Sequence, residues 1–336
     1  MREAMLWEKA QRGKVNCRLC AHRCTVSPGK RGICGVRENR DGTLFSLVYG
    51  TVIAANVDPI EKKPLFHVHP GSRSFSVATA GCNFRCTFCQ NSDISQIPRE
   101  KGTIHGHETT PEALVTKAVE SKSKTIAYTY TEPTVYFELA YDTSRCARER
   151  GIGNVFVTNG YMTREALDTI SPYLDAANVD LKSFSDEFYR THCGARLQPV
   201  LDSLKTMKEL GIWVEITTLL IPTLNDSDDE LKSIASFIRG LGPETPWHIS
   251  RFHPHYRMMD LPATPVETLH RAFRIGKDAG LKYVYTGNVP GDEGEHTFCA
   301  KCGSLVIGRY GFRIEELNLS KGACTKCGTI LDGLFD

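Results

Sequence analysis

Residues 81–91 read Gly81-Cys82-Asn83-Phe84-Arg85-Cys86-Thr87-Phe88-Cys89-Gln90-Asn91. The three cysteines have the spacing C-x3-C-x2-C and follow directly on an apolar, β-prone run from Ser74 to Ala80. Three thiolates on one short loop can bind three irons of a [4Fe–4S] cluster and leave the fourth iron without a protein ligand. A structural zinc site needs four closed ligands, usually in C-x2-4-C pairs, so this loop favours the cluster.

The open iron suggests a specific cofactor. A small molecule with an amine and a carboxylate can chelate such an iron, and the methionine end of S-adenosylmethionine carries both groups. An electron passed into the sulfonium then breaks a C–S bond and gives methionine and a 5′-deoxyadenosyl radical. The protein orients the reactants and excludes water. We therefore predict an enzyme that cleaves S-adenosylmethionine reductively and abstracts hydrogen from a substrate.

Length and composition narrow the class of protein. A chain of 336 residues accommodates one large domain with small appended modules. Lys and Arg total 41 against 39 Asp and Glu, a net charge of +2, which predicts neither a nucleic-acid partner nor an anionic membrane. No apolar run reaches the roughly 18 residues of a membrane span, and the N-terminus has no signal-peptide pattern. Thirteen cysteines without such a signal predict metal sites in a reducing, cytoplasmic location.

From Ser74 onward, apolar runs alternate with stretches of helical pattern, which predicts βαβ units and a parallel sheet. The fold class we expect is α/β, a partial or full (β/α) barrel of the TIM-like kind, over residues 74–290. The expected strands after the cysteine loop begin at Thr125, Val155, Ala177, Trp213, Trp247 and Tyr283. The expected helices are Pro111 to Glu120, Pro133 to Arg150, Arg164 to Ile170, Val200 to Leu210, Asp228 to Arg239 and Val266 to Ala279.

Polar residues follow these strands, at the edge where such folds place their active sites. Glu132 stands at a helix start, where its carboxylate can bind the cofactor's ammonium or act only on the helix dipole. Asn159 lies in the turn after the third strand. Asp180 and Lys182 share one face of the fourth, so they can pair with each other or bracket the cofactor. His253, after the sixth strand, is a further candidate.

Residues 1–42 form a predicted metal-binding module that opens with a short helix. Four cysteines within 18 residues can close around one metal. Spacing alone does not separate zinc from an auxiliary iron–sulfur cluster, but it differs from the usual ferredoxin runs and so favours zinc. His22, inside this loop, is expected to be solvated or hydrogen-bonded. A β-rich connecting segment, 43–73, leads to the barrel. The four ligands are Cys17, Cys20, Cys24 and Cys34.

Residues 291–336 form a second predicted module. Two C-x2-C-Gly pairs are separated by 21 residues, which is the pattern of a zinc ribbon. We expect a structural zinc here, with a rubredoxin-like iron as the alternative. The ligands are Cys299, Cys302, Cys324 and Cys327.

Four motifs together resemble the radical S-adenosylmethionine (radical SAM) superfamily, in its pyruvate formate-lyase-activating-enzyme-like branch. They are the cysteine loop, Thr131-Glu132-Pro133, Thr158-Asn159-Gly160 and Asp180-Leu181-Lys182. The resemblance implies a radical SAM barrel, cluster ligation by the three loop cysteines and an electron donor of the ferredoxin or flavodoxin type. It also implies cofactor contacts by Glu132, Asn159, Asp180, Lys182 and His253.

A longer resemblance covers nearly the whole chain. Cys17 to Asn39, Asp58 to Pro64 and Gly287 to Gly291 look like the radical enzyme of the AmmeMemoRadiSam trio, which implies AMMECR-like and Memo-like proteins as partners. Two features depart from activating enzymes: Tyr130-Thr131 stand where a glycine pair commonly precedes the glutamate, and Gln90 stands where a histidine often follows the third cysteine. The substrate is therefore left open between a protein partner and a small molecule. The alternative from another class is a metal-binding scaffold or redox sensor.

Overall fold

The computed structural model describes residues 1–335, and its centre is one eight-stranded sheet. The strand order is β16-β15-β14-β13-β12-β11-β9-β8. Neighbours from β9 to β16 run parallel, and β8 alone pairs antiparallel, against β9. The strands are β8 (Ala54–Pro59), β9 (Arg73–Ala78), β11 (Thr125–Tyr128), β12 (Gly153–Thr158), β13 (Ala176–Asp180), β14 (Trp213–Leu220), β15 (Trp247–Arg251) and β16 (Val284–Gly287).

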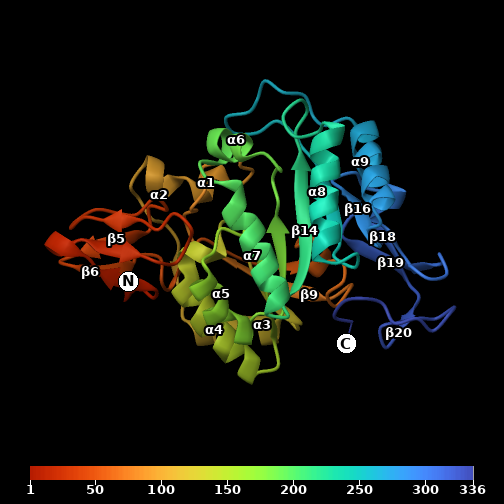
Figure 1. The fold of residues 1–336 in the computed structure, drawn as a ribbon. Helices are drawn as coiled ribbons and strands as arrows, with labels where there is room; N and C mark the ends of the chain where they lie inside the picture. The colour runs from red at the N-terminus through yellow and green to blue at the C-terminus, as the bar shows by residue number, and fades with distance from the viewer. Residues whose placement is uncertain (336) are drawn as a thin grey trace.

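Helices connect the parallel strands and cover the sheet, as Figure 1 shows. Thr110, Thr163 and Ser227 each accept a backbone hydrogen bond at a helix N-terminus, which fixes where three of these helices begin. The six helices are α3 (Pro111–Glu120), α4 (Phe137–Glu149), α5 (Arg164–Ile170), α7 (Leu197–Glu209), α8 (Asp228–Leu241) and α9 (Val266–Asp278). The predicted α/β fold is confirmed as a partial barrel, because β8 and β16 form its two unpaired edges.

The segment between β8 and β9 closes the end of the barrel where the strands begin. Ile60, Leu65 and Val68 are fully buried there. They pack against apolar side chains of the central strands, namely Ala127, Val155 and Ala176. This plug leaves the opposite end, at the carboxyl ends of the strands, as the end that can hold a site.

The N-terminal residues form two small antiparallel sheets, and the predicted opening helix is wrong. Trp7 to Lys9 pair instead with Val15 to Cys17, so that only one turn, η1 (Gln11–Gly13), is helical. The strands are β1 (Arg2–Glu3), β2 (Trp7–Lys9), β3 (Val15–Cys17), β4 (Thr25–Val26), β5 (Arg37–Arg40) and β6 (Thr43–Ser46). Because β6 pairs with β5, and β8 belongs to the central sheet, segment 43–73 is shared between the module and the barrel.

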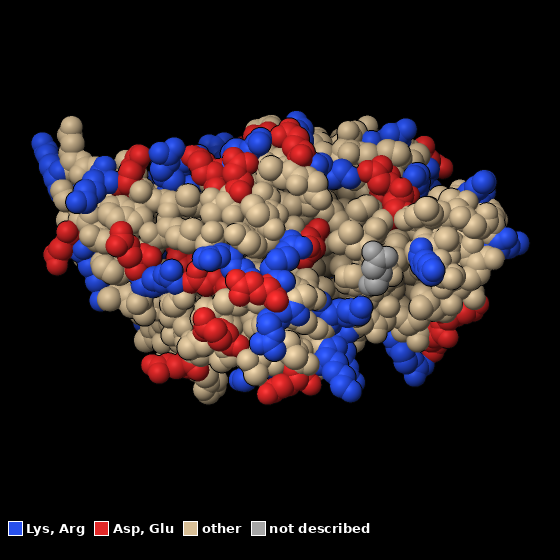
Figure 2. Space-filling model, turned by 90° about the horizontal axis from the view of Figure 1, so that it is seen from below, with Lys and Arg blue, Asp and Glu red and all other residues tan. Residues whose placement is uncertain are grey.

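The C-terminal residues add a three-stranded sheet and a short hairpin. Their strands are β17 (Thr297–Phe298), β18 (Leu305–Tyr310), β19 (Arg313–Leu317), β20 (Leu319–Ser320) and β21 (Ala323–Cys324). Figure 1 shows this module and the N-terminal one on opposite sides of the barrel. None of the described helices is long and apolar enough to cross a membrane. Figure 2 shows basic and acidic side chains interspersed over the face seen from below.

Candidate active site

The cysteine loop leaves β9 in a conformation that only glycine adopts easily. Gly81 has a φ of +105°, and a Cβ at this position would lie 2.7 Å from Cγ1 of Val36. This turn brings the loop over the carboxyl ends of the strands, where Cys82, Cys86 and Cys89 line one cavity of about 500 Å³. That volume lies within the range of small-molecule sites. The structure thus brings together the three cysteines that the sequence singled out.

Two of the three loop sulfurs have a hydrogen-bond partner in the structure. The backbone N–H of Phe84 donates to Sγ of Cys82 over 3.3 Å, and the hydroxyl of Ser95 lies 3.2 Å from Sγ of Cys89. The neighbouring thiol of Cys193 lowers the pKa of Cys86, whereas burial raises the pKa of Cys82 and of Cys89. Iron binds thiolates, so these contacts fit a loop that ligates a cluster.

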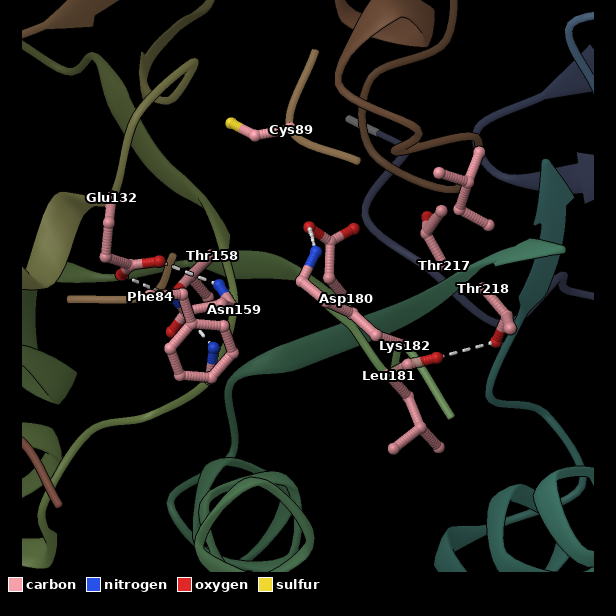
Figure 3. Close-up of polar contacts among 12 residues, drawn as sticks. Phe84, Cys89, Glu132, Thr158, Asn159, Asp180, Leu181, Lys182, Thr217 and Thr218 are labelled. Atoms are coloured by element: carbon pink, nitrogen blue, oxygen red, sulfur yellow. Dashed lines mark hydrogen bonds and ion pairs between the residues drawn. The ribbon is translucent and has the colours of Figure 1, made fainter. Parts of the chain in front are cut away.

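Glu132 lines the same cavity, but the protein itself already holds its carboxylate (Figure 3). Oε1 accepts hydrogen bonds from the amide and hydroxyl of Thr134, at 3.0 and 2.6 Å, and from the hydroxyl of Thr158, at 2.7 Å. Oε2 accepts from the amide of Asn159 at 2.8 Å. Burial raises the pKa of Glu132, and these donors oppose the rise. The helix-start role is confirmed, since Glu132 caps η3 (Pro133–Tyr136), and the predicted cofactor contact stays a prediction.

Asn159 ties this carboxylate to the cysteine loop. Its amide nitrogen Nδ2 donates to Oδ1 of Asn83 at 2.7 Å and lies 3.8 Å from Sγ of Cys82. Its Oδ1 accepts from the amide of Tyr161, so both ends of the side chain are fixed. Glu132, Asn159 and Asn83 therefore form a chain of hydrogen bonds from the start of η3 to Cys82, the first cysteine of the loop.

Asp180 and Lys182 pair with each other at the cavity wall, with 2.9 Å between Nζ and Oδ2 (Figure 3). Burial opposes the charge on Lys182, but Asp180 and the nearby thiols of Cys86 and Cys193 raise its pKa well above the usual value. An ammonium that stays charged beside the cysteine loop can offset the negative charge of thiolates. The predicted pairing occurs, and the predicted contact of this pair with the cofactor stays a prediction.

The opposite wall contains residues to which the sequence assigned no role. Lys62 and Lys63 line the cavity, and both ammonium groups bind Asp58, at 2.9 and 2.7 Å. The hydroxyl of Tyr130 donates to the same carboxylate. These contacts hold the pKa of Asp58 well below its usual value in spite of burial. His253 is exposed and is not among the described residues that line the cavity, so its predicted contact has no support from position.

Cys193 is the main residue that sequence reasoning missed. It is fully buried at the end of η5 (Tyr189–Cys193), and its carbonyl accepts from the amide of Arg85 at 2.9 Å. In the sequence it stands alone, far from the cysteine loop. No spacing pattern indicates that it meets Cys86.

The N-terminal cysteines also face one another. Cys17, Cys20, Cys24 and Cys34 line a separate small cavity with Arg37. His22 is hydrogen-bonded as expected: its Nε2 lies 2.8 Å from the carbonyl oxygen of Asn83. This contact joins the N-terminal loop to the cysteine loop of the barrel.

The C-terminal cysteines form a compact site. The sulfurs of Cys299, Cys302, Cys324 and Cys327 all lie within 4.8 Å of one another. Two of the pairs are 3.6 and 3.8 Å apart. A tetrahedral ion with bonds of about 2.3 Å to sulfur requires S–S distances of about 3.8 Å. The predicted metal-binding site is therefore preformed, although its metal is not identified.

Comparison with known proteins agrees with this geometry. A family profile described as "Radical SAM superfamily" matches residues 76–238. The chain is 49% identical to the uncharacterized protein MJ0808 of Methanocaldococcus jannaschii over 99% of both chains. It is 23% identical to the pyruvate formate-lyase 1-activating enzyme of Escherichia coli, over 64% of this chain and 93% of that one. A radical SAM methyltransferase from Sphaerobacter thermophilus has a similar fold, with a TM-score of 0.50 and 18% identity over 68% of this chain and 71% of that one.

Proposed function

The chain belongs to the radical SAM superfamily, and from this premise we propose that its cavity binds S-adenosylmethionine and generates a radical that abstracts hydrogen from a substrate. The observation that carries the proposal is the convergence of Cys82, Cys86 and Cys89 on one cavity at the carboxyl ends of the strands. Hydrogen-bond partners at the sulfurs of Cys82 and Cys89 support it further.

Within this proposal the three cysteines hold a [4Fe–4S] cluster, which when bound supplies the electron that splits the cofactor into methionine and the 5′-deoxyadenosyl radical. The protein's part is to position and to shield. Glu132, Asn159 and Asn83 fix the loop through their hydrogen bonds. The ion pair of Asp180 and Lys182 keeps a charged ammonium at one wall, beside the cysteine loop.

The segment 58–63 closes the other wall. The carboxylate of Asp58 binds Lys62, Lys63 and Tyr130. Nζ of Lys63 also lies 4.5 Å from the centre of the Tyr130 ring. The side chain of Lys63 is only 1% exposed, so its ion pair with Asp58 lies inside the protein and not on its surface. We infer that this wall helps to keep water away from the reacting cofactor.

For the substrate, we propose a protein partner, as for an activating enzyme. The support is similarity to pyruvate formate-lyase-activating enzymes, one of which the chain matches over 93% of that enzyme's length. The longer resemblance to the AmmeMemoRadiSam trio makes AMMECR-like and Memo-like proteins the partners to try. The second candidate is radical modification of a small molecule, which the cavity of about 500 Å³ favours by its size.

Production of 5′-deoxyadenosine tests the proposal. Anaerobically reconstituted protein with dithionite and S-adenosylmethionine should release it, and Cys86→Ala should not, because the cluster loses one of three protein ligands. Cys146→Ala is the matched control, since Cys146 lies on α4 as a free, half-buried thiol outside the cavity. A Cys86→Ala variant that turns over like wild type would refute the proposal. The absence of product from folded, cluster-loaded wild type would favour the scaffold or sensor alternative.

Adding candidate substrates distinguishes the two substrate classes. Purified AMMECR-like or Memo-like protein should increase 5′-deoxyadenosine formation if a protein is the substrate. Product formation that responds only to small molecules from a metabolite fraction would favour the second candidate.

A further inference from the structure

The four N-terminal cysteines enclose more space than a single ion needs. They line a cavity of about 20 Å³, enough for a water molecule. A tetrahedral zinc with bonds of about 2.3 Å draws its four sulfurs together so closely that no such space remains. The cavity walls come from β3, from the loops around Cys20, Cys24 and Cys34, and from residues 134–135 of the barrel.

The C-terminal site of the same chain provides an internal reference. All four of its sulfurs lie within 4.8 Å of one another, as a single ion requires. Among the described residues, neither the N-terminal cysteines nor the three cysteines of the barrel loop form a compact group of this kind. In a [4Fe–4S] cluster each thiolate binds a different iron, so the sulfurs stand further apart than around one ion. In lacking such a compact arrangement, the N-terminal set resembles the barrel loop and differs from the C-terminal site.

Arg37 supplies a second, independent indication. It is 2% exposed, lines the cavity, and donates from Nη1 to Sγ of Cys17 at 3.2 Å. Its other terminal nitrogen binds Glu138 of α4. Its Nε is buried and has no hydrogen-bond partner among the described atoms of the chain. The bridging sulfides of a cluster offer acceptors to such a donor in addition to the cysteine thiolates, whereas a zinc site offers the thiolates alone.

We propose that Cys17, Cys20, Cys24 and Cys34 bind a second [4Fe–4S] cluster and not zinc. The cluster site is joined to the barrel loop without sharing a residue of its cavity. Arg99 makes the link: its Nη2 donates at 2.9 Å both to the carbonyl of Ile33, next to Cys34, and to the carbonyl of Cys82.

The test removes the barrel cluster first, so that failure of this proposal differs from failure of the proposed function. A Cys82→Ala/Cys86→Ala/Cys89→Ala variant, reconstituted anaerobically with iron and sulfide, should retain about four irons and four sulfides per chain. Its Mössbauer spectrum should be that of a [4Fe–4S] cluster. The same variant with one equivalent of zinc beyond the C-terminal site, and no iron, would overturn the proposal.

A second comparison covers the case in which the triple variant does not fold. Wild type should contain about eight irons, and Cys20→Ser/Cys24→Ser about four, because one of two clusters is lost. Cys146→Ser is the matched control and should keep the wild-type iron content. Equal iron in wild type and in Cys20→Ser/Cys24→Ser, with zinc lost instead, would overturn the assignment.

Discussion

At the scale of single residues, the site depends on hydrogen bonds that the protein makes to itself. The carboxylate of Glu132 accepts four of them, so it cannot be regarded as a free group waiting for a ligand. Its buried position and its link through Asn159 to the cysteine loop make it a positioning residue. A change at Glu132 should therefore affect both stability and the geometry of the loop.

We predict that Glu132→Gln lowers the free energy of unfolding by about 1–3 kcal/mol. Both carboxylate oxygens accept hydrogen bonds in the wild type, and the NH2 group of glutamine would replace one of these oxygens. At least one buried donor would then lose its acceptor. Affinity for S-adenosylmethionine should fall about tenfold as the loop shifts, equivalent to about 1.4 kcal/mol. Thermal unfolding and a cofactor titration followed by EPR measure the two effects. Glu112→Gln, an exposed first-turn glutamate of α3, is the control. Wild-type values for both the free energy of unfolding and the cofactor affinity would contradict a positioning role for Glu132.

At the scale of elements, the plug between β8 and β9 depends on a buried polar network. His67 is fully buried, and its Nδ1 lies 2.6 Å from the carbonyl oxygen of Asp332, to which it donates. Its Nε2 lies 2.6 Å from the hydroxyl of Tyr285. In a neutral ring whose Nδ1 carries the proton, Nε2 accepts the hydrogen bond from this hydroxyl. Glu215 accepts from the amides of Phe66 and His67 and binds His248, so the plug, the sheet and the C-terminal module share one network.

This network predicts a pH dependence of stability. Burial lowers the pKa of His67 from 6.5 to about 4. Between these values the unfolded chain binds a proton that the folded chain does not, so stability falls as the pH falls through this window. Melting temperatures from pH 8 to pH 5 should decline less steeply for His67→Gln than for wild type, even if the variant is less stable at pH 8. His105→Gln, at an exposed position, should keep the wild-type slope. Parallel curves for His67→Gln and wild type would contradict this account.

The C-terminal ribbon makes a separate prediction at this scale. Cys299→Ser/Cys302→Ser should lose about one metal ion per chain, which we expect to be zinc, because two of four preformed ligands are gone. Iron content should stay at the wild-type value, since these sulfurs do not line the cavity of the barrel loop. Metal analysis of both proteins decides the point. An unchanged zinc content would mean that these thiols bind no metal.

At the scale of the whole molecule, the barrel could be predicted from the sequence, but the contacts between distant segments could not. The strands are apolar runs, and the stretches between them have a helical pattern, so the alternation of these two patterns was enough to predict the barrel. The roles of Cys193 and His67 arise only from contacts between distant segments. The ion pair of Arg37 with Glu138, which fixes the N-terminal module to α4, is also such a contact. No local pattern in the sequence records these pairings.

The same reasoning explains the outcome at the site. Residues that follow strands, such as Glu132, Asn159 and Lys182, were found because the carboxyl ends of parallel strands meet at one edge. The wall built from segment 58–63 was not assigned, because a charged segment bracketed by two prolines fits a solvated surface as well as a cover of the active site.

The central claim is that the cavity presents one open iron to S-adenosylmethionine. EPR of the anaerobically reconstituted, dithionite-reduced protein, recorded with and without S-adenosylmethionine, tests it most directly. The cysteine geometry predicts that the cofactor changes the spectrum of the cluster held by Cys82, Cys86 and Cys89. It should do so equally in Cys20→Ser/Cys24→Ser, where only that cluster remains. A reduced cluster whose spectrum is identical with and without saturating cofactor would contradict the account.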